Sequence, residues 1–233
     1  MLKPFQWLEA GNTHFPPLDS ALTEPNGLLA IGGDLTSNRI IQAYKKGIFP
    51  WYNEGEPILW WYPNPRAILK AEDLYVNKTL RKQLNRSPYT ISVNTNFAEV
   101  IDYCANAPFR GQETWITKEM LLAYTHLHNE GYAHSIEVWL NDELVGGLYG
   151  IAINGYFSGE SMFYTRANAS KFALVALSNL LEKEGISFID CQIMNPFLES
   201  MGCKNVQLPE FQQLQTQMVN LTVSPALWKP REL

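Results

Sequence analysis

The feature that most constrains the fold is a series of apolar segments in the C-terminal half of the chain. Residues 134–140, 143–153 and 156–163 are apolar stretches, separated by Asn141-Asp142 and by Asn154-Gly155. Asn-Gly between two apolar runs is the strongest short signal of a β-hairpin, because both residues accept the positive φ that a tight turn requires. The pattern predicts three antiparallel strands in a meander.

A helix and a further strand are predicted to follow the meander. Asn168 is expected to cap a helix over residues 169–184, and Ile186–Ile193 then has the composition of a buried strand. Because side chains alternate along a strand, Asp190 and Gln192 are expected on one face of it. A carboxylate in so apolar a strand requires a partner or a function. Asp190 is therefore either a structural residue held by hydrogen bonds or a residue of a functional site.

The resulting order is β-β-β-α-β, followed by a helix near residues 209–219. This order is similar to the acyltransferase fold of the GNAT type, which predicts the α+β class. In that fold the acyl donor lies where the strand before the long helix diverges from the strand after it. The coenzyme A loop of that fold is expected before the helix, but residues 164–171, YTRANASK, contain no glycine to permit close approach of a pyrophosphate. The acyl donor is therefore expected to be a different molecule.

Two domains of unequal size are predicted. Residues 1–65 form a small N-terminal α/β domain with a helix near 36–46 that Thr36 caps, and residues 66–233 form the GNAT-like catalytic domain; the boundary falls after Pro63 and Pro65. In the second domain, Asn96 with Glu99 three residues later is expected to cap a further helix. Within residues 48–62 six aromatic residues occur without helical or strand periodicity. They form either a buried cluster or a platform on which a planar ligand stacks.

A basic helix face is the best local candidate for contact with phosphates. Lys78, Arg81, Lys82 and Arg86 share one side of a helix predicted over residues 76–86. A solvated surface is the alternative for the same residues. With 18 Lys and Arg against 23 Asp and Glu, the net charge of −5 disfavours nonspecific coating of nucleic acid.

Several classes of protein are not supported by the sequence. No apolar run reaches the length of a membrane span, and the N-terminus lacks the basic-then-apolar pattern of an export signal. Three cysteines without paired spacing suggest reduced thiols and a cytoplasmic location. His126 and His128 lie two residues apart on a predicted helix and do not share a face, so no metal site is expected. No GxSxG nucleophile motif is present.

Seven motifs, GIFPWY, WWYPNPR, ETWIT, HSIEVW, GGLYG, GESMF and IDCQ, occur in an order that resembles the leucyl/phenylalanyl-tRNA–protein transferase family. The resemblance extends from about Pro25 to Gly202, and the first 20 residues and the tail after Lys204 match little. It implies a small N-terminal domain followed by a GNAT-like domain. It also implies transfer of Leu or Phe, and less well Met, from aminoacyl-tRNA to proteins with N-terminal Arg or Lys. Such products enter N-end rule degradation in bacteria.

The resemblance also implies roles for individual residues. It implies that the 3′-terminal adenine of the tRNA is held by Trp51 and Trp115. The pocket for the Leu or Phe side chain would be lined by Phe157, Met162 and Ile189, with Glu160 nearby. The attacking amine would be handled by Asp190 and Gln192. Strand alternation places Phe157 on the opposite face from Glu160, so a β-bulge at Gly159 is expected.

The implied chemistry suits these residue types. An ester becomes an amide, and an α-amine with a pKa of about 7.7–8.0 is partly neutral at pH 7, so neither a cofactor nor a metal is required. Orientation of the reactants alone can supply on the order of 7–11 kcal/mol. Glu160 and Asp190 would attract an acceptor that carries two positive charges. The competing interpretations are a coenzyme A-dependent N-acetyltransferase, a glycosidase or sugar-binding module, and a non-enzymatic aromatic interaction module.

Overall fold

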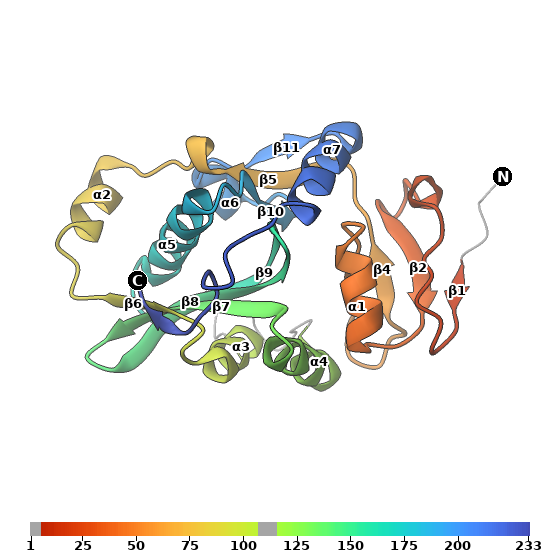
Figure 1. Cartoon of the computed structure of the whole chain (residues 1–233), viewed down its shortest axis with the longest axis horizontal. Helices are drawn as coiled ribbons and strands as arrows, with labels where there is room; N and C mark the ends of the chain where they lie inside the picture. The colour runs from red at the N-terminus through yellow and green to blue at the C-terminus, as the bar shows by residue number, and fades with distance from the viewer. Residues whose placement is uncertain (1–5, 107–115) are drawn as a thin grey trace.

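The computed structural model describes residues 6–106 and 116–233 and contains two β-sheets (Figure 1). The first sheet has the order β1-β2-β4-β3 and is covered by α1. These elements are β1 (Trp7–Leu8), β2 (Leu28–Gly32), α1 (Ser37–Tyr44), β3 (Phe49–Pro50) and β4 (Leu59–Trp61). We refer to them together as the N-terminal unit. Its centre is aromatic, because Trp60 is fully buried and donates its indole N–H to the carbonyl of Gly32 over 2.9 Å.

The second sheet has eight strands in the order β11-β5-β10-β9-β8-β7-β6-β12. Its strands are β5 (Arg66–Lys70), β6 (Thr90–Val93), β7 (Ala133–Leu140), β8 (Glu143–Ile153), β9 (Tyr156–Tyr164), β10 (Phe188–Gln192), β11 (Lys204–Val206) and β12 (Arg231–Glu232). The helices are α2 (Lys78–Leu84), α3 (Phe97–Ala105), α4 (Lys118–Asn129), α5 (Ala169–Lys183), α6 (Pro196–Ser200) and α7 (Leu208–Val219). Helix α5 packs on one face of the sheet and α3 and α4 on the other, so its central strands are buried (Figure 1).

The predicted meander is confirmed. β7, β8 and β9 pair antiparallel, and both connections use residues with positive φ, at +50° for Asn141, +65° for Asp142 and +53° for Asn154. Helix α5 then crosses the sheet, and β10 returns parallel to β9. The structure thus has the β-β-β-α-β order and the α+β class expected from the sequence.

The pairing of β9 with β10 is short, and this opens the sheet. Only Ile189 with Phe157 and Asp190 with Ser158 are paired across the two strands. Beyond this point Glu160 is an extra residue in β9, because Tyr149 pairs with Ser161 whereas Gly150 pairs with Gly159. A bulge of this kind bends a strand and redirects its side chains. The bulge predicted at Gly159 is therefore present one residue further on.

Two predicted helix caps lack the expected hydrogen bond. Asn168 occupies the N-cap position of α5, but its φ is +65° and its side chain donates instead to Gln83, at the end of α2, over 2.9 Å. Thr36 precedes α1, which ends at Tyr44 rather than near residue 46, and its hydroxyl donates to Asp34 over 2.6 Å. In contrast, Asn96 caps α3 through the N–H of Glu99, as its spacing predicts.

The strands that close the sheet come from distant parts of the chain. β5 lies between β10 and β11 and pairs antiparallel with both, and β12 pairs with β6 at the opposite edge. The sheets change over between Trp61 and Arg66, the interval in which the sequence predicts a domain boundary. In the ranges that the structure describes, no helix is long and apolar enough to cross a membrane.

Candidate active site

A cavity of about 640 Å³ lies where β9 and β10 diverge. Its walls come from β9, β10, the middle of β8, α5, the segment around α6, and the N-terminal unit. The lining residues used below are Trp51, Glu160, Met162, Ile189, Cys191 and Gln192. The cavity is therefore lined by five of the residues that the sequence predicts for substrate binding or catalysis: Trp51, Glu160, Met162, Ile189 and Gln192. It lies at the position that the acyltransferase-like order predicts for an acyl donor.

The indole of Trp51 is an exposed aromatic surface of this cavity, as is the ring of Tyr164. Trp51 keeps 43% of its surface accessible, whereas its neighbours Phe49, Tyr52 and Trp60 are buried. Trp61 supports it, with ring centroids 5.8 Å apart and an indole N–H donated to the carbonyl of Trp51 over 2.7 Å. The aromatic run thus divides into a buried cluster and one supported, accessible ring, and stacking of a planar ligand on that ring stays a prediction.

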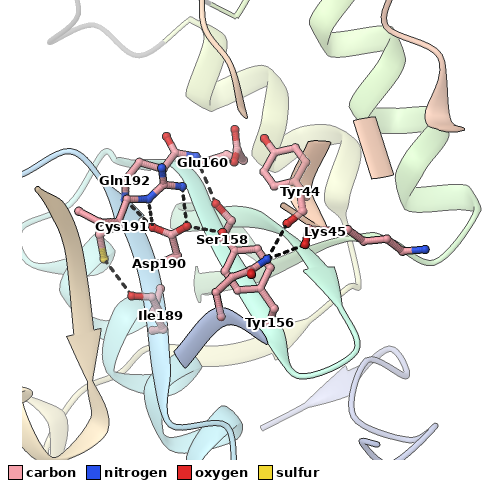
Figure 2. A network of polar contacts seen from close by, with 11 residues as sticks. Tyr44, Lys45, Tyr156, Ser158, Glu160, Ile189, Asp190, Cys191 and Gln192 are labelled. Atoms are coloured by element: carbon pink, nitrogen blue, oxygen red, sulfur yellow. Dashed lines mark hydrogen bonds and ion pairs between the residues drawn. The ribbon is translucent and has the colours of Figure 1, made fainter. Parts of the chain in front are cut away.

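The amide of Gln192 has a fixed orientation. Its Nε2 donates to Glu160 Oε1 over 2.8 Å and to the hydroxyl of Ser158 over 3.2 Å (Figure 2). Because both amide hydrogens have acceptors on β9, the carbonyl oxygen of the side chain is the remaining polar atom of this group. Gln192 thus presents a hydrogen-bond acceptor to the cavity that it lines.

Asp190 is held differently, and its acceptor positions are filled. It is fully buried and is not among the residues that line the cavity. Oδ1 accepts from Arg66 Nε over 2.8 Å and from the backbone N–H of Gln192 over 2.9 Å. Oδ2 accepts from Arg66 Nη2 over 2.7 Å and from the hydroxyl of Tyr156. A carboxylate offers about four lone-pair sites, so no further donor is accommodated.

The register of β10 against β5 shifts between Asp190 and Gln192, and Gln192 has a φ of +63°. Both side chains still reach the same side of β9, because Asp190 accepts from Tyr156 and Gln192 donates to Ser158, two residues further along that strand. This agrees with the predicted shared face, although only Gln192 lines the cavity. The bond from the Gln192 N–H to the Asp190 carboxylate supports this left-handed conformation.

Arg66 is a buried counterion that the sequence analysis does not single out. Its guanidinium lies between the rings of Phe49 and Phe211, with Cζ 4.9 and 4.7 Å from their centroids. Burial alone lowers the pKa of Arg66, but the Asp190 carboxylate offsets this effect and raises it. The residue stays charged, so the pair fixes β5 to β10. Its position after the Pro63 and Pro65 turn gave no periodic signal.

Glu160 is the titratable group on the cavity wall. Its Oε1 accepts from Gln192, and its Oε2 accepts from the hydroxyl of Tyr124 over 3.2 Å. Burial raises the pKa of Glu160 to about 7, against the lowering effect of hydrogen bonds from Tyr44, Tyr124 and Gln192. The carboxyl group therefore changes its charge near neutral pH. Tyr44 and Tyr124, from α1 and α4, were also missed, because neither helix is near β9 in sequence.

Phe157 and the predicted basic residues lie apart from the cavity. Phe157 is buried, and its ring stacks on Trp228 at 5.5 Å instead of lining the cavity. Lys78, Arg81, Lys82 and Arg86 are exposed on and just after α2, at the opposite end of the molecule from the N-terminal unit (Figure 1). Trp115 lies outside the described residues. Within the described ranges, no cluster of three or more His, Cys, Asp or Glu residues could hold a metal ion.

Comparison with known proteins gives matches over the whole chain. The family model "Leucyl/phenylalanyl-tRNA protein transferase" matches residues 68–216, and that of its N-terminal domain matches residues 33–64. The leucyl/phenylalanyl-tRNA–protein transferase of Colwellia psychrerythraea is 55% identical over 231 residues, which cover 97% of this chain and 96% of that protein. The transferase of Pseudoalteromonas translucida is 47% identical over 233 residues, which cover 100% and 98%.

Solved structures resemble the chain only remotely. L-PGS from Bacillus licheniformis has a TM-score of 0.39 at 14% identity and covers 72% of this chain and 54% of that chain. A GCN5-related N-acetyltransferase-like protein from Streptococcus suis has a TM-score of 0.36 at 11% identity and covers 73% and 64%. The sequence matches, in contrast, are close and extend over both parts of the chain. The chain belongs to the leucyl/phenylalanyl-tRNA–protein transferase family.

Proposed function

We propose that this protein transfers Leu or Phe, and less well Met, from aminoacyl-tRNA to the α-amino group of proteins with N-terminal Arg or Lys. The products would enter N-end rule degradation in the cytoplasm, where aminoacyl-tRNA is made. One observation carries the proposal: the accessible indole of Trp51 and the hydrogen-bonded pair Glu160–Gln192 line the same cavity of about 640 Å³. Family membership supports the choice of substrates.

The donor would bind by its 3′ end. The exposed face of Trp51 is suited to stacking on the terminal adenine, because a base and an indole stack with a gain of about 1–3 kcal/mol. Trp115, in our proposal, supplies a second ring. The exposed basic residues around α2 would meet tRNA phosphates, with Lys78, Arg81, Lys82 and Arg86 as the contacts.

The aminoacyl side chain would enter the apolar part of the cavity. Met162 and Ile189 lie on its walls together with Leu174 and Leu177 of α5. Such a lining favours an unbranched-β, bulky apolar side chain through burial of surface, at about 25 cal/mol per Å². Phe157 pairs with Ile189 and, in this proposal, supports the apolar wall from behind rather than touching the substrate.

Gln192 is the residue that we place at the reacting amine. Its carbonyl oxygen would accept a hydrogen bond from the amine and align the nitrogen lone pair with the ester carbonyl carbon. The C–N bond forms, the bond from that carbon to the ribose oxygen breaks, and one amine proton leaves with the ribose hydroxyl. Asp190 would act as a positioning residue, since it holds the backbone of Gln192 and has no open acceptor site.

Glu160 would favour the acceptor electrostatically. A chain that begins with Arg or Lys brings two positive charges, and an ionised carboxylate in a poorly solvated wall attracts them more strongly than one in water. It also accepts from Gln192 and so keeps that amide in its orientation. Substrate binding and alignment of the catalytic amide therefore depend on the same carboxylate.

The direct test is transfer of labelled leucine from Leu-tRNA to peptides that differ only in their first residue. We expect transfer to peptides that begin with Arg or Lys, and none to a peptide that begins with Ala or to an Arg peptide with an acetylated amine. Trp51→Ala should raise the KM for the donor, whereas Trp51→Phe should retain most of its affinity. Acetyl transfer from acetyl-CoA, with no transfer from Leu-tRNA, would favour the N-acetyltransferase interpretation instead.

A further inference from the structure

Glu160 is held by two tyrosine hydroxyls that come from helices far from it in sequence. Tyr124 of α4 contacts Glu160 Oε2 over 3.2 Å, and its oxygen lies 2.7 Å from the hydroxyl of Tyr44 at the end of α1. Both tyrosine side chains are fully buried. Figure 2 shows the ring of Tyr44 directed toward Glu160 from the side of the N-terminal unit. Three polar groups from three elements thus form one continuous chain.

The direction of the hydrogen bonds in this chain follows from Glu160. An ionised carboxylate can only accept, so the Tyr124 hydroxyl donates to it. The Tyr124 oxygen must then accept from Tyr44, whose hydroxyl is the donor in the 2.7 Å contact. Burial and the Glu160 charge raise the pKa of both tyrosines well above the usual value, so both remain neutral donors. The chain is therefore oriented to stabilise the charged form of Glu160.

We propose that Tyr44 and Tyr124 are positioning residues which keep Glu160 ionised at the cavity wall, so that the N-terminal unit contributes to the reaction centre. This inference rests on the proposed function, in which ionised Glu160 attracts the acceptor and orients Gln192. Each hydroxyl acts through the next: Tyr44 polarises Tyr124, and Tyr124 bonds the carboxylate. The two hydroxyls thus lower the pKa of Glu160, which burial raises.

The other groups that face Glu160 act in both directions. Gln192 on β10 donates to it and favours its charge, whereas Asp190 on the same strand raises the pKa of Glu160 by repulsion. Arg66 on β5 carries the opposite charge and pairs with Asp190. Tyr149 on β8 packs edge-on against Tyr124, at 5.8 Å between ring centroids. If a donating hydroxyl is lost, burial and Asp190 therefore raise the pKa of Glu160 further.

The experiment replaces each hydroxyl and follows the titration of Glu160 itself. Glu side chains labelled with ¹³C at the carboxyl carbon give a resonance that Glu160→Gln removes and thereby assigns. Tyr124→Phe should raise the pKa of Glu160 by about one unit, because a hydrogen bond to a charged group contributes about 1.5–3 kcal/mol and one unit corresponds to 1.36 kcal/mol. Tyr44→Phe should raise it by a smaller amount. Tyr103→Phe, whose ring stacks on Phe163, is the matched control and should leave it unchanged.

The same variants should show a pH-dependent defect in leucine transfer. Because the pKa rises, the acid limb of kcat/KM for an Arg peptide should move to higher pH in Tyr124→Phe, and activity should recover at pH 8.5. A merely structural defect would lower activity equally at every pH. An unchanged Glu160 titration in both variants, or a loss of activity without recovery, would overturn the proposal. If the wild-type protein transferred no leucine at all, the proposed function would fail, while the spectroscopic titration would still decide on the two hydroxyls.

Discussion

Gln192 reaches the cavity because its backbone adopts a φ of +63°, which residues other than glycine rarely do without support. The support is Asp190, which accepts the Gln192 N–H and is itself held by Arg66 and Tyr156. A strained residue whose side chain enters a cavity is a common feature of functional sites. At the scale of single residues, we propose a division of roles: Gln192 contacts the substrate, and Asp190 fixes the backbone conformation that makes this contact possible.

We therefore expect different defects from the two neighbouring substitutions. Gln192→Ala should lower kcat by about a hundredfold or more and leave the free energy of unfolding nearly unchanged, since it removes a group that meets the reacting amine. Asp190→Asn should instead destabilise the protein by about 3–5 kcal/mol, because it leaves Arg66 buried without its counterion. Urea denaturation and single-turnover transfer separate the two effects. Full activity in Gln192→Ala would remove this residue from the mechanism.

Sequence reasoning found the residues that carry local signals and missed their partners. Trp51, Glu160 and Gln192 lie in recognisable motifs, and the structure places all three at one cavity. Arg66 was missed because its partner lies 124 residues away, and no periodic pattern links two such positions. For the same reason the left-handed conformation of Gln192 was missed: alternation along a strand does not reveal a shift of register against the paired strand.

At the scale of elements, the meander was predictable because its turns are encoded locally, whereas the edges of the sheet were not. Asn-Gly and Asn-Asp fix two hairpins regardless of the rest of the chain. β5, β11 and β12 are short, and each acquires its strand conformation from a partner remote in sequence. The position of the bulge in β9 also depends on β8, because a bulge exists only where two residues of one strand lie opposite a single residue of its partner.

The bulge allows a prediction from two glycines that pair across β8 and β9. A Cβ added at Gly150 would lie 2.3 Å from the carbonyl oxygen of Ser158 and 2.4 Å from the ring of Phe157, whereas one added at Gly159 would meet nothing closer than 3.7 Å. Gly150→Ala should lower the free energy of unfolding by about 1–3 kcal/mol through overpacking. Gly159→Ala is the control and should change it little. Equal effects in urea denaturation would contradict this account of the packing.

Helix α2 allows a test of tRNA binding at the level of one element. The double substitution Lys78→Glu and Arg81→Glu should weaken binding and reduce the slope of log Kd against log salt by about one to two, because two phosphate contacts are lost. Lys183→Glu with Lys229→Glu makes the same change in net charge at exposed positions elsewhere. A salt slope that stays the same in the α2 variant, or falls equally in both, would assign the phosphates to another surface.

At the scale of the whole molecule, the cavity is shared between the N-terminal unit and the large sheet. Phe49, Pro50 and Trp51 come from the former, and most of the remaining walls come from the latter. Helix α7 connects the two: buried Gln215 donates to the carbonyl oxygens of Tyr44 and Lys45 at the end of α1, over 3.3 and 2.8 Å. The segment after Lys204, in which the sequence motifs show little resemblance to the family, lies within the family match as far as residue 216 and supports the same site.

Loss of this connection should affect donor binding first. Gln215→Ala should raise the KM for Leu-tRNA several-fold with a smaller change in kcat, because Trp51 would be held less firmly while Gln192 and Glu160 keep their contacts on β9 and β10. Gln213→Ala changes an exposed residue of the same helix and is the control. Steady-state transfer at varied donor concentration measures both constants. A pure kcat defect would show that the connection acts on chemistry rather than on the donor.

The placement of β5 has a consequence for how the chain matures during synthesis. This strand is made before both of its partners, β10 and β11, and 124 residues separate Arg66 from Asp190. Until β10 emerges from the ribosome, the guanidinium of Arg66 has no carboxylate partner and the cavity has no Gln192. The nascent protein can form its hairpins before this point, but the wall of the cavity is complete only after β10 has been made.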